Sequence, residues 1–392
     1  MTEPAGAADR TIAAGTGPPA RKPRILAVDA ARCLALIGMM GVHVLPEVNF
    51  KDEPTLTWML FAGRASALFA LLAGVSLAFS SGGTRRLTGR PLAAARTGVA
   101  VRAVVIMAIG LLLGYADPGV DIILAFYGAM FLLAVPLLGL RPRTLAILAA
   151  VFALAGPVLL LALRPLLPVP DNDNPTFSTL AEDPFLSLGQ LLFTGGYPAV
   201  PWMAYMCAGL ASGRMDLRSR RTTVLLLGFG FVLAAGCWLV SGLLLSVVED
   251  LSAGEIVRLL VDGYDPDISE DSWWWLIAAS PYSSMPLELL HTIGTAMIAL
   301  GTLLAAGRHL HQVLAVLAPA GSMTLTLYSA HLLFLATGML GARPFESFGL
   351  QVGAALVAGV LWRNLAGAGP LERLVSAASN QARNRVAGGD SP

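Results

Sequence analysis

The sequence predicts an all-α fold: a polytopic membrane helical bundle of about ten transmembrane helices, with both termini in the cytoplasm. The first observation is composition. Of the 392 residues, 56% are hydrophobic and 13% are charged, about half the charged fraction of a soluble protein. The second is the grouping of apolar residues into runs that approach the ~20 residues needed to cross a bilayer. The alternation that marks a membrane β-barrel is absent.

Ten apolar runs are expected to cross the membrane. They lie over residues 25–46, 58–81, 97–116, 120–138, 144–167, 190–212, 222–247, 287–307, 319–341 and 346–366. Segment 309–318 is expected to be a short inner connection. The Ala/Gly/Pro-rich residues 1–24 predict a disordered cytoplasmic tail, residues 25–370 the transmembrane domain, and residues 371–392 a cytoplasmic C-terminal tail. The first span is too long and too charged for a cleaved signal peptide, so it should remain as an anchor.

Basic residues predict the orientation because they gather on one side of the expected bundle. That side holds Arg10, Arg21, Lys22, Arg24, Arg85, Arg86, Arg90, Arg96, Arg141, Arg143, Arg214, Arg218, Arg220, Arg221, Arg308, Arg363, Arg373, Arg383 and Arg385. The opposite loops hold most of the acidic residues, and the longest of these loops covers 248–286. By the positive-inside rule the arginine-rich side is cytoplasmic, and the expected location is the inner (plasma) membrane of the cell.

The first span carries three ionisable groups that lipid alone would not tolerate: Asp29, Arg32 and His43. Asp29 and Arg32 are three residues apart, so they share a helix face and can pair. His43 follows Asp29 by fourteen residues, which is roughly 21 Å along a helix axis. One helix is therefore expected to place an ion pair near the inner face and an imidazole in the outer half of the membrane.

Other ionisable side chains are expected at the depth of His43. Arg64 lies about two turns into the second span from its outer end, and Glu288 and His291 open the eighth span at its outer end. His331 lies past the midplane of the ninth span. Ionisable groups within a membrane usually face the bundle interior or a water-filled cavity. For each histidine taken alone a structural role stays open, and so does a purely structural ion pair for Asp29–Arg32.

Several other site types are excluded or left without a signal. No run has the spacing of a metal site, so no metal is expected. No phosphate-binding loop and no aromatic–basic interleaving is present, which argues against nucleotide and nucleic-acid binding. Cys33, Cys207 and Cys237 lie in apolar runs, and their odd number favours a packing role. The run Trp273–Trp275 fits either an interfacial belt or a lid that stacks on a sugar or lipid.

Several strings of the sequence match a known family. The run RILAVDAARCLALIGMMGVH resembles the R-x-x-x-x-D-x-x-R-G opening of the transmembrane acyltransferase superfamily, in the branch related to heparan-α-glucosaminide N-acetyltransferase. The strings GRASALFALLAGVSLAFSSGG, YPAVPWMAYMCAGLASGRMDL, GSMTLTLYSAH and WRNLAGAGPLERLV look like bacterial members. The sequence departs from the motif at Cys33, where the family usually has Gly, which should loosen the close helix approach that a glycine allows.

The resemblance implies an O- or N-acyltransferase that moves an acyl group from cytosolic acyl-CoA to a carbohydrate or glycolipid on the extracytoplasmic side of the membrane. Acetyl is the acyl group that it favours. No permanently bound cofactor is expected, because acyl-CoA is a co-substrate. We assign the chemistry to His43 as general base or acyl carrier, with Arg64 or His291 stabilising the oxyanion. The residues expected to bind donor or substrate are Asp29, Arg32, Arg85, Arg86, His331, Trp202 and Tyr205.

Two rival interpretations use the same residues. A secondary transporter or proton-coupled flippase also needs intramembrane ionisable groups, although no internal repeat marks the chain as one. A non-catalytic membrane protein with structural histidines is the other. Membrane lipids, acyl-CoA and the acceptor are the expected partners, nucleic acid is not, and the sequence leaves the oligomeric state open, a homodimer included. The inner Arg85, Arg86, Arg90 and Arg96 fit either a topology signal or a site for the donor's phosphates.

Overall fold

The computed structural model describes residues 25–167, 174–248, 251–261, 263, 273–307 and 309–388. Its secondary structure confirms the predicted all-α class, because the described residues form helices and the only β-feature among them is one isolated bridge between Val48 and Pro54. The expected N-terminal tail over 1–24 and the most acidic part of the outer loop, 264–272, lie outside the described residues.

The helices follow one another as a series of apolar segments with short connections. They are α1 (Leu26–Val44), α2 (Leu56–Phe61), α3 (Arg64–Ser80), α4 (Gly89–Gly114), α5 (Ile123–Ala134), η1 (Val135–Gly139), α6 (Pro142–Leu163), η2 (Arg164–Leu166), α7 (Phe177–Glu182), α8 (Pro184–Gly189), η3 (Gln190–Thr194), α9 (Ala199–Gly213), α10 (Arg220–Leu245), α11 (Ala253–Val261), η4 (Trp273–Ile277), α12 (Pro286–Ala306), α13 (His311–Gly321), α14 (Thr324–Ala336), α15 (Pro344–Leu365) and α16 (Pro370–Ala387).

Most of the expected spans are long enough to cross a membrane. Seven segments of the described chain meet that test by length and hydropathy: Leu26–Val44, Leu56–Ser80, Gly89–Gly114, Pro142–Leu166, Arg220–Leu245, Pro286–Ala306 and Pro344–Leu365. The pair α13 and α14 makes an eighth if it is counted as one bent span. The other two predicted spans contain shorter helices, α5 with its continuation η1 and the 15-residue α9.

The expectation of a short connection over 309–318 is wrong, because residues 311–321 form α13. This helix is apolar and buries Leu314 and Ala318 in contact with α1 and α15. It meets α14 at an angle of 66°. Gly321 lies against the backbone of Asp29 and Cys33, where a Cβ atom would collide with the Asp29 carbonyl. The close helix approach that the cysteine was expected to loosen is therefore made by a glycine of the partner helix.

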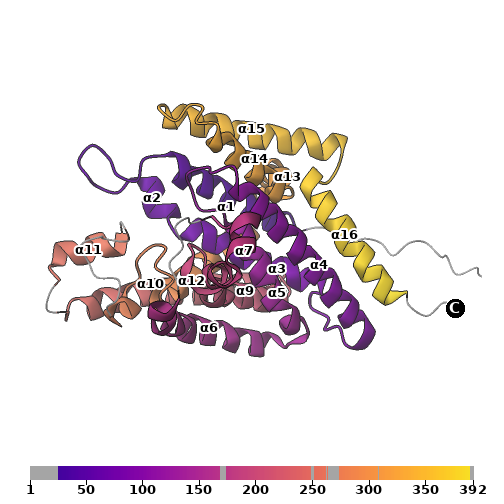
Figure 1. Cartoon of the computed structure of the whole chain (residues 1–392), viewed down its shortest axis with the longest axis horizontal. Helices are drawn as coiled ribbons and strands as arrows, with labels where there is room; N and C mark the ends of the chain where they lie inside the picture. Colours follow the sequence, from indigo (N-terminus) through magenta and orange to yellow (C-terminus); the bar gives the residue numbers. More distant parts are fainter. Residues whose placement is uncertain are drawn as a thin grey trace, which may run out of the picture.

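Small residues also bring other helices together within the bundle. Gly74 of α3 and Gly209 of α9 face each other, and a Cβ atom at Gly74 would lie 2.9 Å from the Gly209 Cα. Gly230 of α10 and Gly294 of α12 form a similar crossing. Close backbone contact through small residues is how helices associate where lipid removes the hydrophobic drive. In Figure 1, α15 lies along one edge of this bundle and α6 along the opposite edge.

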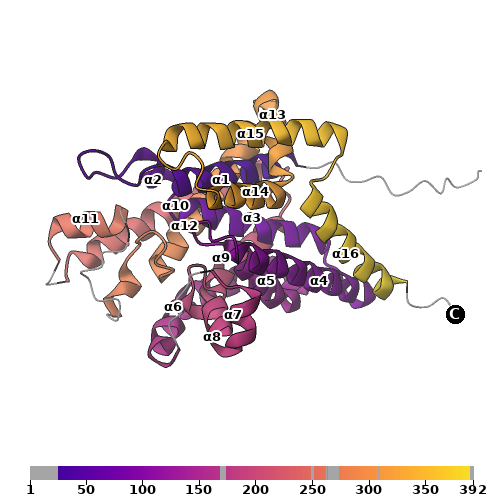
Figure 2. The same cartoon turned by 45° about the horizontal axis from the view of Figure 1, so that its top comes forward.

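The two ends of the bundle carry different elements. In both Figure 1 and Figure 2, α11 and α2 lie at one end and α16 at the other. This agrees with the predicted placement of segment 248–286 and the C-terminus on opposite sides. Most of the expected C-terminal tail is the helix α16, which packs antiparallel to the first half of α4: Ser379 donates to the Gly98 carbonyl (2.8 Å) and Arg90 to the Val386 carbonyl (3.0 Å).

The string GPLE at the start of α16 connects this helix to α14. Glu372 accepts hydrogen bonds from the Thr326 backbone N–H (3.1 Å) and the Thr326 hydroxyl (2.6 Å). Thr326 is the third residue of α14, so the carboxylate satisfies an N–H in the first turn of a helix and complements its positive end. The C-terminal helix is thereby tied to the break between α13 and α14.

Candidate active site

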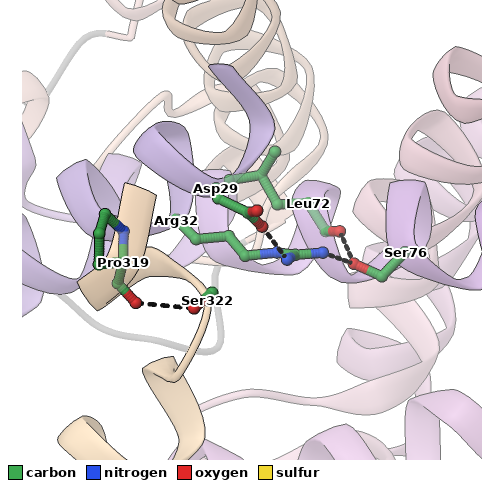
Figure 3. Close-up of polar contacts among 6 residues, drawn as sticks. All are labelled: Asp29, Arg32, Leu72, Ser76, Pro319 and Ser322. Atoms are coloured by element: carbon green, nitrogen blue, oxygen red, sulfur yellow. Dashed lines mark hydrogen bonds and ion pairs between the residues drawn. The ribbon is translucent and has the colours of Figure 1, made fainter. Parts of the chain in front are cut away.

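The expected ion pair of the first span is present. Arg32 donates to Asp29 at 2.7 Å and also to the Ser76 hydroxyl on α3, which in turn donates to the Leu72 carbonyl at 2.6 Å. Figure 3 shows the Arg32 guanidinium held between the carboxylate and Ser76, with Ser322 on the neighbouring chain segment. The pair and Ser76 thus hold the Arg32 guanidinium between α1 and α3.

Asp29 and Arg32 line a cavity of about 680 Å³ at the α16 end of the bundle. Its walls come from the start of α1, the loop after α3, the loop between α9 and α10, and the α13–α14 break. The lining residues are Ile25, Val28, Asp29, Arg32, Phe79, Gly82, Gly83, Thr84, Gly213, Met215, Asp216, Leu217, Arg218 and Ser322. The lining combines two arginines with two aspartates, an aromatic ring and a glycine-containing loop, so it offers charged hydrogen-bonding groups and apolar surface to a ligand.

A buried arginine that the sequence marked only as a topology signal shapes this cavity. Arg214 donates to the Ser81 and Gly83 carbonyls (3.0 Å each) and the Ser81 hydroxyl (2.9 Å), and also to the Leu138 carbonyl. These bonds hold the loop after α3 in place, where Gly82 and Gly83 adopt positive φ angles of 110° and 62°. Arg214 therefore positions one wall of the cavity.

The other two expected donor-binding arginines lie outside the cavity lining. Arg86 is exposed and donates through two nitrogens to the Gly139 carbonyl at 3.1 and 2.8 Å. Arg85 is exposed on the same loop. Arg218, which the sequence used only to assign orientation, lines the cavity instead.

The structure brings His43 and His331 together although 288 residues separate them. His43 Nδ1 lies 3.0 Å from His331 Nε2, and the two ring planes are nearly parallel with centroids 5.3 Å apart, so the rings meet edge to edge. His331 Nδ1 lies 2.5 Å from Gln351 Oε1, and Gln351 Nε2 donates to Ser347 at 3.1 Å. His331 is only 3% exposed and Gln351 is also buried, whereas His43 is half-buried; this row of side chains is called the His43–His331–Gln351 relay.

The orientation of the Gln351 amide determines the direction of each hydrogen bond in the relay. With Gln351 Oε1 facing His331 Nδ1, this contact is a hydrogen bond when His331 Nδ1 carries the proton and donates it. His331 Nε2 is then an acceptor, which assigns a proton to His43 Nδ1. The lone pair of His43 Nε2 is left, and no described residue bonds to it.

His291 belongs to a second group of polar side chains. Arg64 lies 3.2 Å from His291 Nε2, and His291 Nδ1 lies 2.8 Å from the Ala234 carbonyl. Arginine only donates, so His291 Nε2 accepts and Nδ1 donates. Buried Glu288 attracts Arg64 electrostatically. His291 thus orients Arg64, and its own lone pair is engaged.

Tyr205 and Trp202 of α9 complete this second group. The Tyr205 hydroxyl lies 2.7 Å from the Thr292 hydroxyl and 3.4 Å from both Glu288 oxygens. Trp202 donates to the Ser284 hydroxyl at 2.9 Å, and its ring packs edge-on against Tyr205 with centroids 5.0 Å apart. Both side chains are buried, so they support the Arg64–His291 pair from α9.

Comparison with known families decides which protein class this bundle represents. The family model described as the heparan-α-glucosaminide N-acetyltransferase catalytic domain matches residues 24–239. The chain belongs to this family. No curated protein matched the chain. The matched region contains α1, with Asp29, Arg32 and His43, and Arg64. Membership supports an acetyltransferase built into a membrane and gives no support to the transporter interpretation.

Sequence reasoning missed Gln351, Ser76 and Arg214. Gln351 had a usable signal, because it is an amide in an apolar run, and such a group needs a partner in the bundle. Ser76 and Arg214 had none. Serine is common in membrane helices, and an arginine next to a loop has the same sequence signature whether it is exposed or buried.

Proposed function

We propose that the protein transfers an acyl group from cytosolic acyl-CoA to an amine or hydroxyl of a carbohydrate or glycolipid on the opposite side of the membrane. Acetyl is the expected acyl group. His43 is the general base. The assignment is carried by the hydrogen-bond pattern: when the Gln351 oxygen accepts from His331, only His43 among His43, His291 and His331 keeps a ring lone pair that no described residue engages.

The donor's phosphates would bind in the cavity at the inner end, where Arg32 and Arg218 supply positive charge. Arg32 and His43 are eleven residues apart on α1, which is roughly 16 Å along the axis. The thioester must reach across this distance, and the long phosphopantetheine arm of acyl-CoA is suited to it. Family membership and the arginine-lined cavity support this orientation of the donor.

The proposed chemistry uses one residue from each of the two groups of polar side chains. The acceptor nitrogen or oxygen attacks the thioester carbonyl carbon while His43 Nε2 takes its proton. Arg64, held by His291, would stabilise the negative charge that develops on the carbonyl oxygen. Collapse of the tetrahedral intermediate breaks the carbon–sulfur bond, and the proton passes from the imidazolium to the departing thiolate. The His43–His331–Gln351 relay would keep His43 in the tautomer that can accept a proton.

The test is acyl transfer by purified protein supplied with acetyl-CoA and a panel of amino sugars and glycosides. His43→Ala should lose about 10²–10⁴-fold in kcat while acetyl-CoA binding stays near normal. His309→Ala, in an exposed inner turn, is the matched control and should keep its activity. Normal turnover by His43→Ala would overturn the assignment of the base, and absence of any transfer by the unaltered protein would overturn the function.

A further inference from the structure

Arg102 is an arginine inside α4 that the bundle leaves without a polar partner. It lies in the apolar run over 97–116, and no hydrogen bond or ion pair joins it to another residue in the part of the chain that the structure describes. Its guanidinium carbon lies 5.8 Å from the centroid of the Phe131 ring on α5. Charged groups within a membrane almost always pair, so Arg102 needs a partner that the described protein does not supply.

Helix geometry directs Arg102 into the bundle. Successive residues of an α-helix are about 100° apart, so Arg102 and Val104 lie on nearly opposite sides of α4. Val104 is 56% exposed and marks the lipid-facing side, whereas Val99 and Ile106, which share the side of Arg102, are buried. In Figure 1 and Figure 2, α4 runs beside α5, and α16 packs against it. The charge of Arg102 is therefore inside the protein and not at its lipid surface.

Part of the Arg102 guanidinium can be reached by a ligand. The side chain is only partly buried, and among its nitrogens only Nε is both inaccessible and without a partner. Nη1 and Nη2 keep accessible surface, and no described residue bonds to them. Each of these atoms carries two N–H groups in the plane of the guanidinium, which is the arrangement that binds phosphate oxygens in pairs.

The charges around Arg102 favour an anion. Arg32 repels Arg102 more strongly than Glu372 attracts it. The two carboxylates nearby are already engaged: Asp29 accepts from Arg32, and Glu372 accepts from the backbone and hydroxyl of Thr326. An anion between the two arginines would relieve their repulsion and accept hydrogen bonds from both guanidinium groups.

Arg32 connects this group to the donor cavity. Arg32 is part of the cavity lining, and Arg102 is not, so an anionic group that passes Arg32 from the cavity comes next to Arg102. In acyl-CoA the group at this position is the diphosphate, which lies between the adenosine and the pantetheine arm that carries the thioester. A diphosphate has oxygens enough to accept from both arginines at once, whereas the single phosphate of a protein-bound phosphopantetheine has fewer.

We infer that Arg32 and Arg102 together clamp the diphosphate of the donor, and that this clamp selects a coenzyme A thioester over an acyl group carried on a protein-bound phosphopantetheine. The inference rests on the proposed acyl transfer from acyl-CoA, and it names the residue that determines which acyl carrier is accepted. Arg102 is then a binding residue that takes no part in proton transfer.

The test is binding of coenzyme A and its fragments, without any acceptor, to purified protein in phosphatidylcholine nanodiscs. Arg102→Leu should weaken the binding of coenzyme A and of 3′-dephospho-coenzyme A by the same factor, about 10- to 100-fold, because both carry the diphosphate. Pantetheine, which has no phosphate, should bind as before. The unaltered protein should bind coenzyme A about tenfold more tightly than 4′-phosphopantetheine, and Arg102→Leu should remove most of that difference.

Two further variants complete the series. Arg102→Lys keeps the charge but not the planar pair of donors, so it should recover part of the lost affinity. Arg143→Leu removes one positive charge from an exposed position at the inner end of α6 and is the matched control, with unchanged binding of every fragment.

Three outcomes would overturn the inference. Because no described residue bonds to Arg102, Arg102→Leu should keep or raise the unfolding temperature measured without ligand; a lowered temperature with unchanged coenzyme A binding would show a structural role. An equal loss of affinity for coenzyme A and for pantetheine would show that Arg102 does not contact phosphate. If native mass spectrometry shows that the variant loses a bound phosphatidylglycerol while its coenzyme A affinity stays normal, the anion is a lipid headgroup.

The inference and the function on which it rests can fail separately. If acetyl transfer occurs and Arg102→Leu keeps the normal acetyl-CoA KM, the clamp is wrong although the transferase function stands. If no acceptor is acetylated yet coenzyme A binds and Arg102→Leu weakens that binding, the clamp stands and the transferase proposal fails.

Discussion

Removing the side-chain oxygen of Gln351 should lower the activity of His43 as a base, although Gln351 does not contact His43. In Gln351→Leu the His331 Nδ1 proton loses its acceptor at 2.5 Å, and an unpaired buried N–H costs about 1–3 kcal/mol. The other tautomer of His331, with its proton on Nε2, avoids this unpaired N–H and becomes favoured. It would then donate to His43 Nδ1, which places the His43 proton on Nε2 and removes the lone pair that the reaction needs.

The size of the effect follows from that tautomer change. The penalty of about 1–3 kcal/mol corresponds to a loss of roughly 5- to 150-fold in kcat, since 1.4 kcal/mol is a factor of ten. Most of this range lies below the 10²–10⁴-fold that a general base contributes, because a fraction of molecules keeps the active tautomer. The acetyl-CoA KM should not change, since Gln351 is absent from the lining of the donor cavity.

The assay is steady-state acetyl transfer by purified variants in lipid nanodiscs. Gln351→Glu should retain activity, because a carboxylate oxygen still accepts from His331. Gln312→Leu is the matched control, since Gln312 is exposed on α13. Nitrogen-15 NMR of labelled histidine reports the tautomers without any turnover. If Gln351→Leu keeps full kcat, or if Gln351→Glu loses as much as Gln351→Leu, the relay does not act on His43.

Three further predictions concern the rest of the bundle. Arg32→Ala leaves the Asp29 carboxylate unpaired and removes a donor-site cation, so we expect lower thermal stability and a higher acetyl-CoA KM. In the unaltered protein the acetyl-CoA KM should rise with salt concentration. A salt-independent KM would contradict phosphate binding. Gly321→Ala puts a Cβ atom into the Asp29 carbonyl and should destabilise the fold by about 1–3 kcal/mol, visible in thermal unfolding; an unchanged melting temperature would show that α13 can move away. Gly254→Cys on α11 should react with an impermeant thiol reagent on intact cells and Arg218→Cys should not, because the positive-inside rule places these residues on opposite sides; the reverse pattern would invert the topology.

The sequence alone determined the class of the fold. Apolar runs near membrane length predict helices whatever their neighbours, because a backbone in lipid must satisfy its own hydrogen bonds. The Asp29–Arg32 pair was equally predictable, since residues three apart on a helix are neighbours. The prediction of a loop over 309–318 was wrong because the hydropathy signal there was weaker. The apolar run around α13 is short and is flanked by histidines on one side and by glycine and serine on the other.

Only the tertiary structure decided how the site is assembled. His43, His331 and Gln351 come from three helices far apart in the sequence, and the depth of each residue in its span says nothing about which helix faces point at one another. The choice of His43 over His291 depends on single hydrogen bonds to Arg64 and to the Ala234 carbonyl. The hydropathy of a segment predicts whether its residues lie in the membrane or near water. Helix packing, set by contacts such as that of Gly321 with Asp29, determines its neighbours and therefore its chemistry.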